Sequence, residues 1–231
     1  FKSIAKWTSI ITWLKSKLGE NSSSQEKIKL IYSACRNILK EYFINIASTR
    51  ILRNLDEIIP ILEAYLREVN LNFTALFGIL EKDPPVYIHS ANVGFLCAFL
   101  GIKAKMNLES VRELTLGGML FDVGKKEVPY EILTKKGELT PEEFRAIRKH
   151  PAAGKKVLND IKCYSKNILA MASEHHEKFD GTRYPFGLSE NKITPFAKIY
   201  GIMDVFSSLT CDRDHREPFT PLQALTMMKK K

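Results

Sequence analysis

Histidine and aspartate side chains between residues 89 and 204 have the types and spacing of metal ligands. The chain has only five histidines, and four of them lie beside hydroxyl-bearing or charged residues in helical patterns. Imidazole nitrogens and carboxylate oxygens are the usual ligands of Zn, Fe and Mn, and one carboxylate can bridge two metal ions. A carboxylate in an apolar helix also needs a partner that offsets its desolvation. The pattern favours a metal site over capping or ion pairing; the candidate ligands are His89, Asp122, His150, His175, His176 and Asp204.

Helices are expected to position these side chains. Three Thr-Pro pairs, at 140–141, 194–195 and 220–221, place a capping hydroxyl at the N-cap and proline at the first helical position. Glu143 completes a capping box with Thr140. Few runs alternate between apolar and polar residues, so the sequence predicts an all-α fold.

A proline pair at 84–85 divides the chain, because consecutive prolines end helices. We expect a helical connector or regulatory region over residues 1–82 and a second domain over 83–231. Within the connector, helical stretches are expected over 25–47 and 49–81, after an opening helix with a basic polar face. That opening helix would lie on an anionic membrane surface or pack against its neighbours. Because the chain does not begin with Met, we expect it to be part of a longer protein, with further residues also after its C-terminus.

Composition narrows the class of protein. The 231 residues are 45% hydrophobic and 26% charged, which is typical of a globular protein and excludes disordered, collagenous and purely coiled-coil chains. The longest uninterrupted apolar run, 93–102, is half the length of a membrane span, so no transmembrane segment is expected. Four cysteines lie far apart without a C-x-x-C pair, which favours reduced thiols and a cytoplasmic location.

The net charge of +9 has two interpretations, an anionic partner or a solvated basic surface. The surplus is spread over both parts of the chain, and no segment forms a basic arm. Without a basic stripe or a recognition motif, the charge gives no reason to expect a nucleic-acid partner.

Several short motifs follow one another in order along the second domain. They are His89-Ser-x-x-Val93, Phe121-Asp-Val-Gly-Lys125, Lys149-His150-Pro151, His175-His-Glu177, Asp180-Gly181-x-x-Tyr-Pro185 and Asp204-Val-Phe206. With these motifs and gaps, residues 86–228 resemble the HD-GYP domain, a bacterial branch of the HD superfamily of metal-dependent phosphohydrolases. The resemblance implies an HD-superfamily helical bundle after the connector, and hydrolysis of cyclic di-GMP.

The resemblance also implies how the candidate ligands divide between two metal ions. The first ion would be held by His89, Asp122 and Asp204. The second would be held by Asp122, His150, His175 and His176, so that Asp122 bridges the pair. Two such ions acidify a shared water molecule and draw charge from the phosphoryl oxygens.

Four further residues acquire roles from the resemblance. Lys125 would act with Asp122 in catalysis by neutralising charge near the scissile phosphate, or would be a solvated lysine at a helix end. Tyr184 belongs to the GYP loop and would contact the cyclic dinucleotide. The basic residues implied to bind it are Arg213 and Arg216, which could instead pair with neighbouring acids.

Two positions depart from the family pattern. Phe121 replaces the His of the HD pair, so the first site loses a ligand, and we expect one firmly bound ion and a second that is weak or absent. Arg183 replaces the Gly of the GYP motif. If that position has a positive φ, arginine is strained there by about 1 kcal/mol or more. The added charge of Arg183 would either meet a substrate phosphate or block the entrance.

The sequence therefore predicts an HD-GYP-type cyclic di-GMP phosphodiesterase with weakened activity. The alternative is a catalytically silent relative that binds cyclic di-GMP or a partner protein, and a third interpretation is a phosphohydrolase for another nucleotide. The expected cofactor is one or two divalent ions, Fe or Mn before Zn or Ni. A signalling partner would bind near the GYP loop, and the helical connector is compatible with a homodimer.

Overall fold

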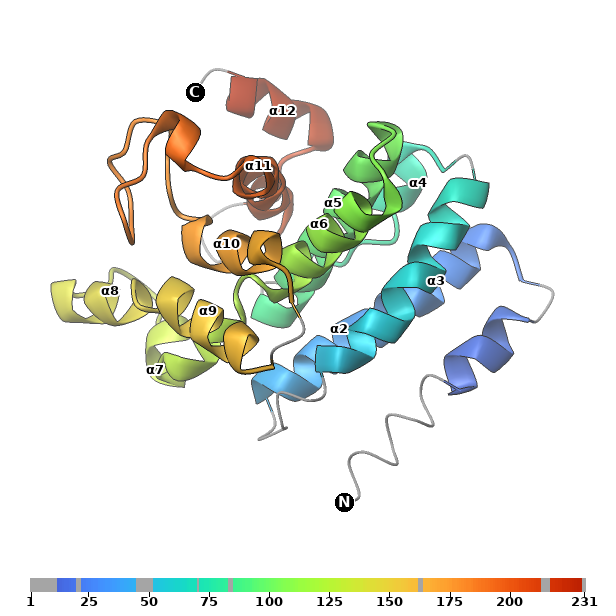
Figure 1. The fold of residues 1–231 in the computed structure, drawn as a ribbon, viewed down its shortest axis with the longest axis horizontal. Helices are drawn as coiled ribbons and strands as arrows, with labels where there is room; N and C mark the ends of the chain where they lie inside the picture. Colours follow the sequence, from blue (N-terminus) through green and yellow to red (C-terminus); the bar gives the residue numbers. More distant parts are fainter. Residues whose placement is uncertain are drawn as a thin grey trace. The chain divides into compact units, whose positions relative to one another are not determined.

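The structure is a computed structural model that describes residues 12–19, 22–44, 52–69, 71–82, 85–161, 164–212 and 217–229. These residues are mostly helical (Figure 1) and include no β-strand, only an isolated bridge between Asp180 and Ser189. The predicted all-α class is confirmed. Of the predicted opening helix, residues 12–18 are helical and the preceding part lies outside the described residues.

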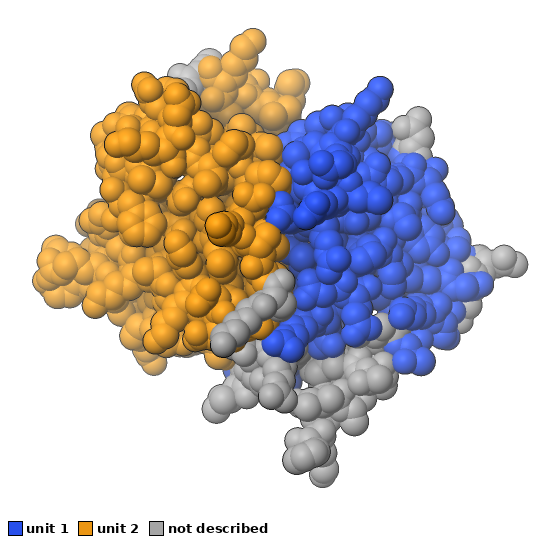
Figure 2. All heavy atoms as spheres, viewed as in Figure 1, with its two compact units in different colours: residues 1–116 blue, residues 117–231 orange. Residues whose placement is uncertain are grey.

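The chain divides into two compact units, residues 1–116 and residues 117–231 (Figure 2). The first unit takes in α5 (Val86–Lys103), because this helix packs against the helices of the predicted connector. The compact units divide after residue 116, so that α5 belongs with the helices before it. The domain boundary expected at 82/83 therefore stays a prediction. Each unit is described below by itself.

Helices with apolar inner faces build the first unit. α2 packs against both α3 and α5 (Figure 1), and isoleucine and leucine side chains fill the space between them. One polar pair crosses this core: the Tyr32 hydroxyl donates to Oδ1 of Asn92 at 2.7 Å, which satisfies two buried groups. The remaining elements of this unit are α2 (Ser24–Ile44), α3 (Asn54–Glu68), α4 (Phe73–Phe77) and α6 (Leu108–Leu120), which continues into the second unit.

The single helical stretch expected over 49–81 is wrong. α3 ends at Glu68, and Val69 adopts an extended conformation. The short helix α4 then starts at a new cap, because the Asn72 side chain accepts a hydrogen bond from the Ala75 N–H at 2.8 Å. The side-chain cap at Asn72 therefore begins a separate helix after the extended residue that ends α3.

α5 is the described helix with the length and apolar composition of a membrane span. Within the protein, 61% of this 18-residue window is buried. Its contacts with α2 and α3 are those of a core helix.

A buried carboxyl group lies on α3 of the first unit. Glu63 is 5% exposed, and its Oε1 accepts no hydrogen bond. Burial raises the pKa of Glu63 to about 7, although the positive charges of Arg112 and Arg67 oppose this rise. The folded protein therefore holds a proton that the unfolded chain releases at lower pH.

Glu63→Gln is expected to stabilise the protein at pH 8 but not at pH 4.5. The raised folded-state pKa makes a stabilising contribution that is complete below the unfolded value and is lost as pH rises through about 7. Relative to the Gln variant, the parent should therefore lose about 3 kcal/mol of unfolding free energy over this range. Urea unfolding at a series of pH values measures this, with the exposed Glu57→Gln as control. A constant difference between parent and Glu63→Gln at all pH values would contradict the prediction.

Short helices and turns around α9 to α11 build the second unit. α9 packs against the turn η2 and against α10, and α11 packs against α10 and α12. All three predicted Thr caps are confirmed: Thr140 forms the full capping box with Glu143, Thr194 accepts from the Ala197 N–H, and Thr220 accepts from the Gln223 N–H. The elements are η2 (Val123–Glu127), α7 (Tyr130–Leu133), α8 (Pro141–Ile147), α9 (His150–Ile161), α10 (Lys166–Glu174), η3 (Glu190–Lys192), α11 (Pro195–Thr210) and α12 (Pro221–Lys229).

Two glycines allow η2 to approach the start of α9. A Cβ on Gly124 would lie 2.0 Å from the carbonyl oxygen of His150 and 2.4 Å from the backbone nitrogen of Gly154. Both atoms belong to the backbone and cannot rotate away. This contact holds η2, which directly follows Asp122, beside His150, the first residue of α9.

Gly124→Ala is expected to lower the free energy of unfolding by more than about 2 kcal/mol, because the methyl group overlaps backbone atoms. Gly201→Ala is the matched control, since a Cβ on Gly201 of α11 meets nothing within 4 Å. Alanine should stabilise that helix by up to about 1 kcal/mol. Chemical denaturation of both variants measures the difference. Equal stability of the two variants would contradict the close approach at Gly124.

Candidate metal centre

Four of the predicted ligands converge in the second unit. His150 begins α9, His175 and His176 follow α10, and Asp122 precedes η2. Nε2 of His150 lies 2.9 Å from Nε2 of His175 and 3.2 Å from Nε2 of His176. Oδ1 of Asp122 lies 3.3 Å from Nε2 of His150 and 3.7 Å from Nε2 of His175. The ligand nitrogens of the three imidazoles thus lie within 4.8 Å of one another, and Oδ1 of Asp122 lies beside two of them.

Backbone carbonyl groups orient two of these rings. Nδ1 of His150 lies 2.6 Å from the carbonyl oxygen of Ile147, and Nδ1 of His175 lies 3.0 Å from that of Ala172. A carbonyl oxygen only accepts, so each Nδ1 carries a proton and donates it. Whenever both rings are neutral, their lone pairs then lie on the two Nε2 atoms that face each other. Metal-binding histidines are commonly oriented by an outward Nδ1–H of this kind.

The cluster fits a divalent metal ion. Burial, followed by the neighbouring imidazoles, holds the pKa of His175 well below its usual range and lowers that of His176 to about 4, so both rings are neutral at pH 7. Oδ1 of Asp122 is buried and accepts no hydrogen bond. A cation would relieve both the repulsion between facing lone pairs and the desolvation of this oxygen. Three imidazoles with one carboxylate suit Zn, Fe, Mn or Ni.

Lys125 holds the other oxygen of Asp122. Its Nζ donates to Oδ2 at 2.6 Å from three residues further along the chain. Burial opposes ionisation of Asp122, but the Lys125 ammonium and the adjacent His150 imidazole hold the pKa of the carboxyl well below its usual range. Asp122 is therefore ionised at neutral pH, and Lys125 is engaged with it instead of extending into solvent.

Comparison with known families identifies the family of this chain. The family described as HD domain matches residues 76–231, which is more than half of the chain. The chain belongs to the HD domain family. HD domains bind divalent metal ions, and the cluster of His150, His175 and His176 offers a site for one.

Curated relatives of this HD protein are named as cyclic-dinucleotide phosphodiesterases. A cyclic di-GMP phosphodiesterase of Pseudomonas aeruginosa is 35% identical over 154 residues, which are 67% of this chain and 37% of the relative. One from Thermotoga maritima is 32% identical over 62% of this chain and 41% of its own. The 3'3'-cGAMP-specific phosphodiesterase 1 of Vibrio cholerae is 32% identical over 64% and 34%. The HD chain spans from about a third to two fifths of the length of these relatives.

A solved structure has the same fold as this HD protein. It is that of Bd1817, an HDG"Y"P protein from Bdellovibrio bacteriovorus, with a TM-score of 0.68 and 21% sequence identity. The match covers 92% of this chain and 74% of that chain. At this identity the likeness concerns the fold, and it agrees with the all-α class.

Two predicted ligands of the HD protein lie on other helices. Asp204 is on α11, and its negative charge opposes the lowering of the His175 and His176 pKa values, so it lies within electrostatic range of the cluster. His89 is half-buried on α5, in the first unit. The ligand roles of both residues remain predictions. The predicted substrate-binding residues that lie outside the described residues are Arg213 and Arg216.

An aromatic ring replaces the His of the HD pair. Phe121 is 2% exposed, and its ring centroid lies 5.2 Å from that of His175 with 75° between the planes. On another side the ring contacts Tyr200, with 4.6 Å between centroids. Phe121 therefore forms an apolar wall beside a predicted ligand and supplies no ligand atom itself.

Two glutamates hold the loop that follows the histidine pair, and sequence reasoning gave neither of them a role. Glu177 accepts hydrogen bonds from the backbone N–H groups of Phe186 at 2.6 Å and Leu188 at 2.9 Å. Glu174 accepts from the Thr194 N–H at 2.9 Å. The position of Glu177 next to two histidines was the available signal. Through these bonds the loop of the Tyr-Pro motif is fixed to the end of α10.

Tyr184 lies against the cluster. Its ring centroid is 4.6 Å from that of His176, and burial raises the pKa of Tyr184 to about 12, so the hydroxyl is neutral. Its neighbour Arg183 is exposed. Among the described residues, the non-glycine positions with positive φ are Lys105 and Glu190. The strain expected at Arg183 is therefore absent, because its backbone is not left-handed.

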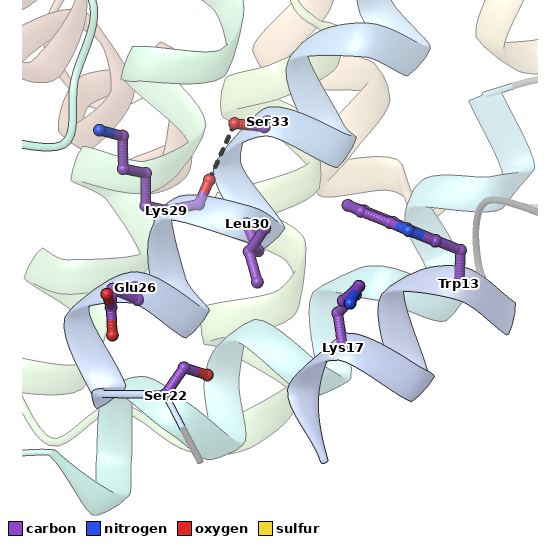
Figure 3. Close-up of a pocket in the computed structure, with 7 residues that line it drawn as sticks. All are labelled: Trp13, Lys17, Ser22, Glu26, Lys29, Leu30 and Ser33. Carbon is purple, nitrogen blue, oxygen red and sulfur yellow. Dashed lines mark hydrogen bonds between the residues drawn. The ribbon is translucent and has the colours of Figure 1, made fainter. Parts of the chain in front are cut away.

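A pocket in the first unit offers different chemistry. Figure 3 shows Trp13 and Lys17, from the helix at 12–18, across from Leu30 of α2. The carboxylate in its lining, Glu26, is held by the N–H and hydroxyl of Ser23, each at 2.7 Å. The residues that line this pocket include no histidine and no second carboxylate, so it presents neither an acid–base pair nor a set of metal ligands.

Proposed function

We propose that this HD protein is a metal-dependent phosphodiesterase of the HD-GYP type that hydrolyses cyclic di-GMP. The observation that carries the proposal is the cluster of three imidazoles, with Oδ1 of Asp122 beside Nε2 of His150 and Nε2 of His175. The names of the Pseudomonas and Thermotoga relatives support the substrate. The cysteines that the structure describes are buried and form no disulfide with one another, in keeping with a reducing cytoplasm; they are Cys35, Cys97 and Cys211.

The proposed cofactor is Fe or Mn, with Zn or Ni as alternatives. When bound, a divalent ion acidifies water and withdraws charge from phosphoryl oxygens. The complete ligand set would hold one ion firmly; its members are Asp122, His150, His175 and His176. The second set would bind its ion weakly or not at all, because Phe121 supplies no ligand; its members are His89, Asp122 and Asp204.

The chain's own groups orient the substrate and balance charge. Lys125 keeps Asp122 ionised and places its ammonium beside the cluster, where it would neutralise charge on the departing oxygen. The neutral hydroxyl of Tyr184 would donate a hydrogen bond to the nucleotide, and Arg183 extends into solvent from the same loop. The other proposed substrate-binding residues are Arg213 and Arg216.

A catalytically silent relative that binds cyclic di-GMP or a signalling partner is the second candidate. Phe121 favours it, because a buried aromatic ring occupies the position of a family ligand. A partner would bind near the GYP loop, and a second copy of the chain would associate through the helical connector.

Turnover of cyclic di-GMP decides between the two candidates. The purified chain is supplied anaerobically with Fe²⁺ or Mn²⁺, and the products are separated by chromatography. The expected result is slow hydrolysis that stops on chelation and resumes when metal is restored. Tight binding of cyclic di-GMP without hydrolysis would favour the silent signalling protein.

A further inference from the structure

An exposed arginine stacks on the tyrosine that lies against the metal cluster. Cζ of Arg148 is 4.7 Å from the ring centroid of Tyr184 and 5.8 Å from that of Phe144. The two rings are nearly perpendicular, with 80° between their planes and 6.4 Å between centroids. The guanidinium is therefore held in a corner formed by two aromatic side chains.

The side-chain donors of Arg148 are available to a ligand. The two acidic residues of α8 are paired with other cations, Glu142 with Arg145 and Glu143 with Lys135. In the part of the chain that the structure describes, no carboxylate pairs with Arg148. A guanidinium stacked on a ring keeps its in-plane N–H groups as a fork that matches two adjacent acceptors.

The same stack leads to the cluster. The Tyr184 ring that supports Arg148 lies 4.6 Å, centroid to centroid, from the His176 imidazole. Two stacking steps therefore separate the guanidinium from a proposed ligand of the metal ion that would bind the scissile phosphate. Because the two steps are 4.7 Å and 4.6 Å, one nucleoside, whose base lies one sugar away from its phosphate, can span them.

We propose that Arg148, with Phe144 and Tyr184, forms a subsite that recognises a guanine base of the substrate. The inference rests on the proposed function, because it takes the phosphate to bind at the cluster. An arginine fork pairs with O6 and N7 of guanine, whereas adenine presents N7 beside a donor. Phe144 is 44% exposed and offers a ring face for a base to stack on. A base can stack on an aromatic face beside the fork, a contact that a phosphate cannot make, so the aromatic corner favours a base.

The test measures nucleotide preference by equilibrium binding. Phosphorothioate analogues of cyclic di-GMP, 3'3'-cGAMP and cyclic di-AMP, which resist hydrolysis, are titrated into the Mn²⁺-supplied chain by calorimetry. In Arg148→Ala, the ratio of affinities for the di-guanine over the di-adenine ligand should fall about tenfold or more. Arg148→Lys keeps the charge but lacks the fork, and it should lose the preference as well. Arg145→Ala is the matched control, since this arginine of α8 pairs with Glu142.

Three results would overturn the subsite. They are an unchanged preference in Arg148→Ala, an equal loss of affinity for all three nucleotides, and a parent chain that binds none of them or prefers none. Equal loss would indicate a charge contact with phosphate. Turnover of the natural nucleotides, measured separately, keeps the two proposals apart. A parent that binds with a guanine preference but does not hydrolyse would overturn the proposed activity and leave the subsite standing.

Discussion

Asp122→Ala is expected to release the metal ion and to lower the rate of cyclic di-GMP hydrolysis at least about 100-fold. At metal sites, the loss of an outer-shell partner alone costs about 10 to 100-fold in affinity or activity. Asp122 is a proposed ligand, with Oδ1 3.3 Å from Nε2 of His150, so its removal should cost more. Metal content per chain, by elemental mass spectrometry, and initial rates with Fe²⁺ or Mn²⁺ measure the effect.

The matched control is Asp160→Ala, which removes an exposed aspartate of the helix that begins at His150. Metal content and rate should not change in this variant. Circular dichroism of both variants establishes that each is folded, because Asp122→Ala also removes the acceptor for Lys125. Full metal content and undiminished turnover in Asp122→Ala would contradict the role of Asp122 as a ligand.

Local signals in the sequence were sufficient for the fold class and for several helix starts. A Thr-Pro pair places the capping oxygen and the fixed proline φ within two residues, so Thr140, Thr194 and Thr220 were identified without tertiary information. The break between α3 and α4 was missed. It depends on one capping side chain, Asn72, within a continuous apolar pattern that alone favours a longer helix.

Spacing in the sequence alone could not identify the metal ligands. Residues 122, 150 and 175 are far apart in sequence, and spacing alone left capping and ion pairing open. What brings the first two together is the backbone contact at Gly124 and Gly154, which no periodicity reports. The stack of Arg148 on Tyr184 was also invisible, because an arginine next to Lys149 at the end of a helix has the pattern of a solvated charge. Such contacts arise only when α8, α9 and the loop after α10 have packed.

Phe121→His is expected to strengthen binding of a second metal ion by about 10 to 100-fold and to raise turnover of cyclic di-GMP. The ring at this position is buried, 5.2 Å from the His175 ring centroid, so an imidazole there would lie beside the cluster. The exchange also removes an aromatic contact with Tyr200, and about 1 to 3 kcal/mol of stability should be lost with it. Metal titration by calorimetry and steady-state rates measure the first two effects.

Phe121→Leu separates ligation from packing. It removes the same aromatic contact but supplies no nitrogen, so it should lose stability without gaining a metal ion or activity. If the His and Leu variants bind the same number of ions and turn over at the same rate, the lost histidine is not what limits this chain. If the parent chain has no activity and only Phe121→His hydrolyses cyclic di-GMP, then Phe121 is the residue that silences the site. The parent protein would then act by binding cyclic di-GMP. Its remaining metal-ligating side chains would stabilise the fold of the site without supporting hydrolysis.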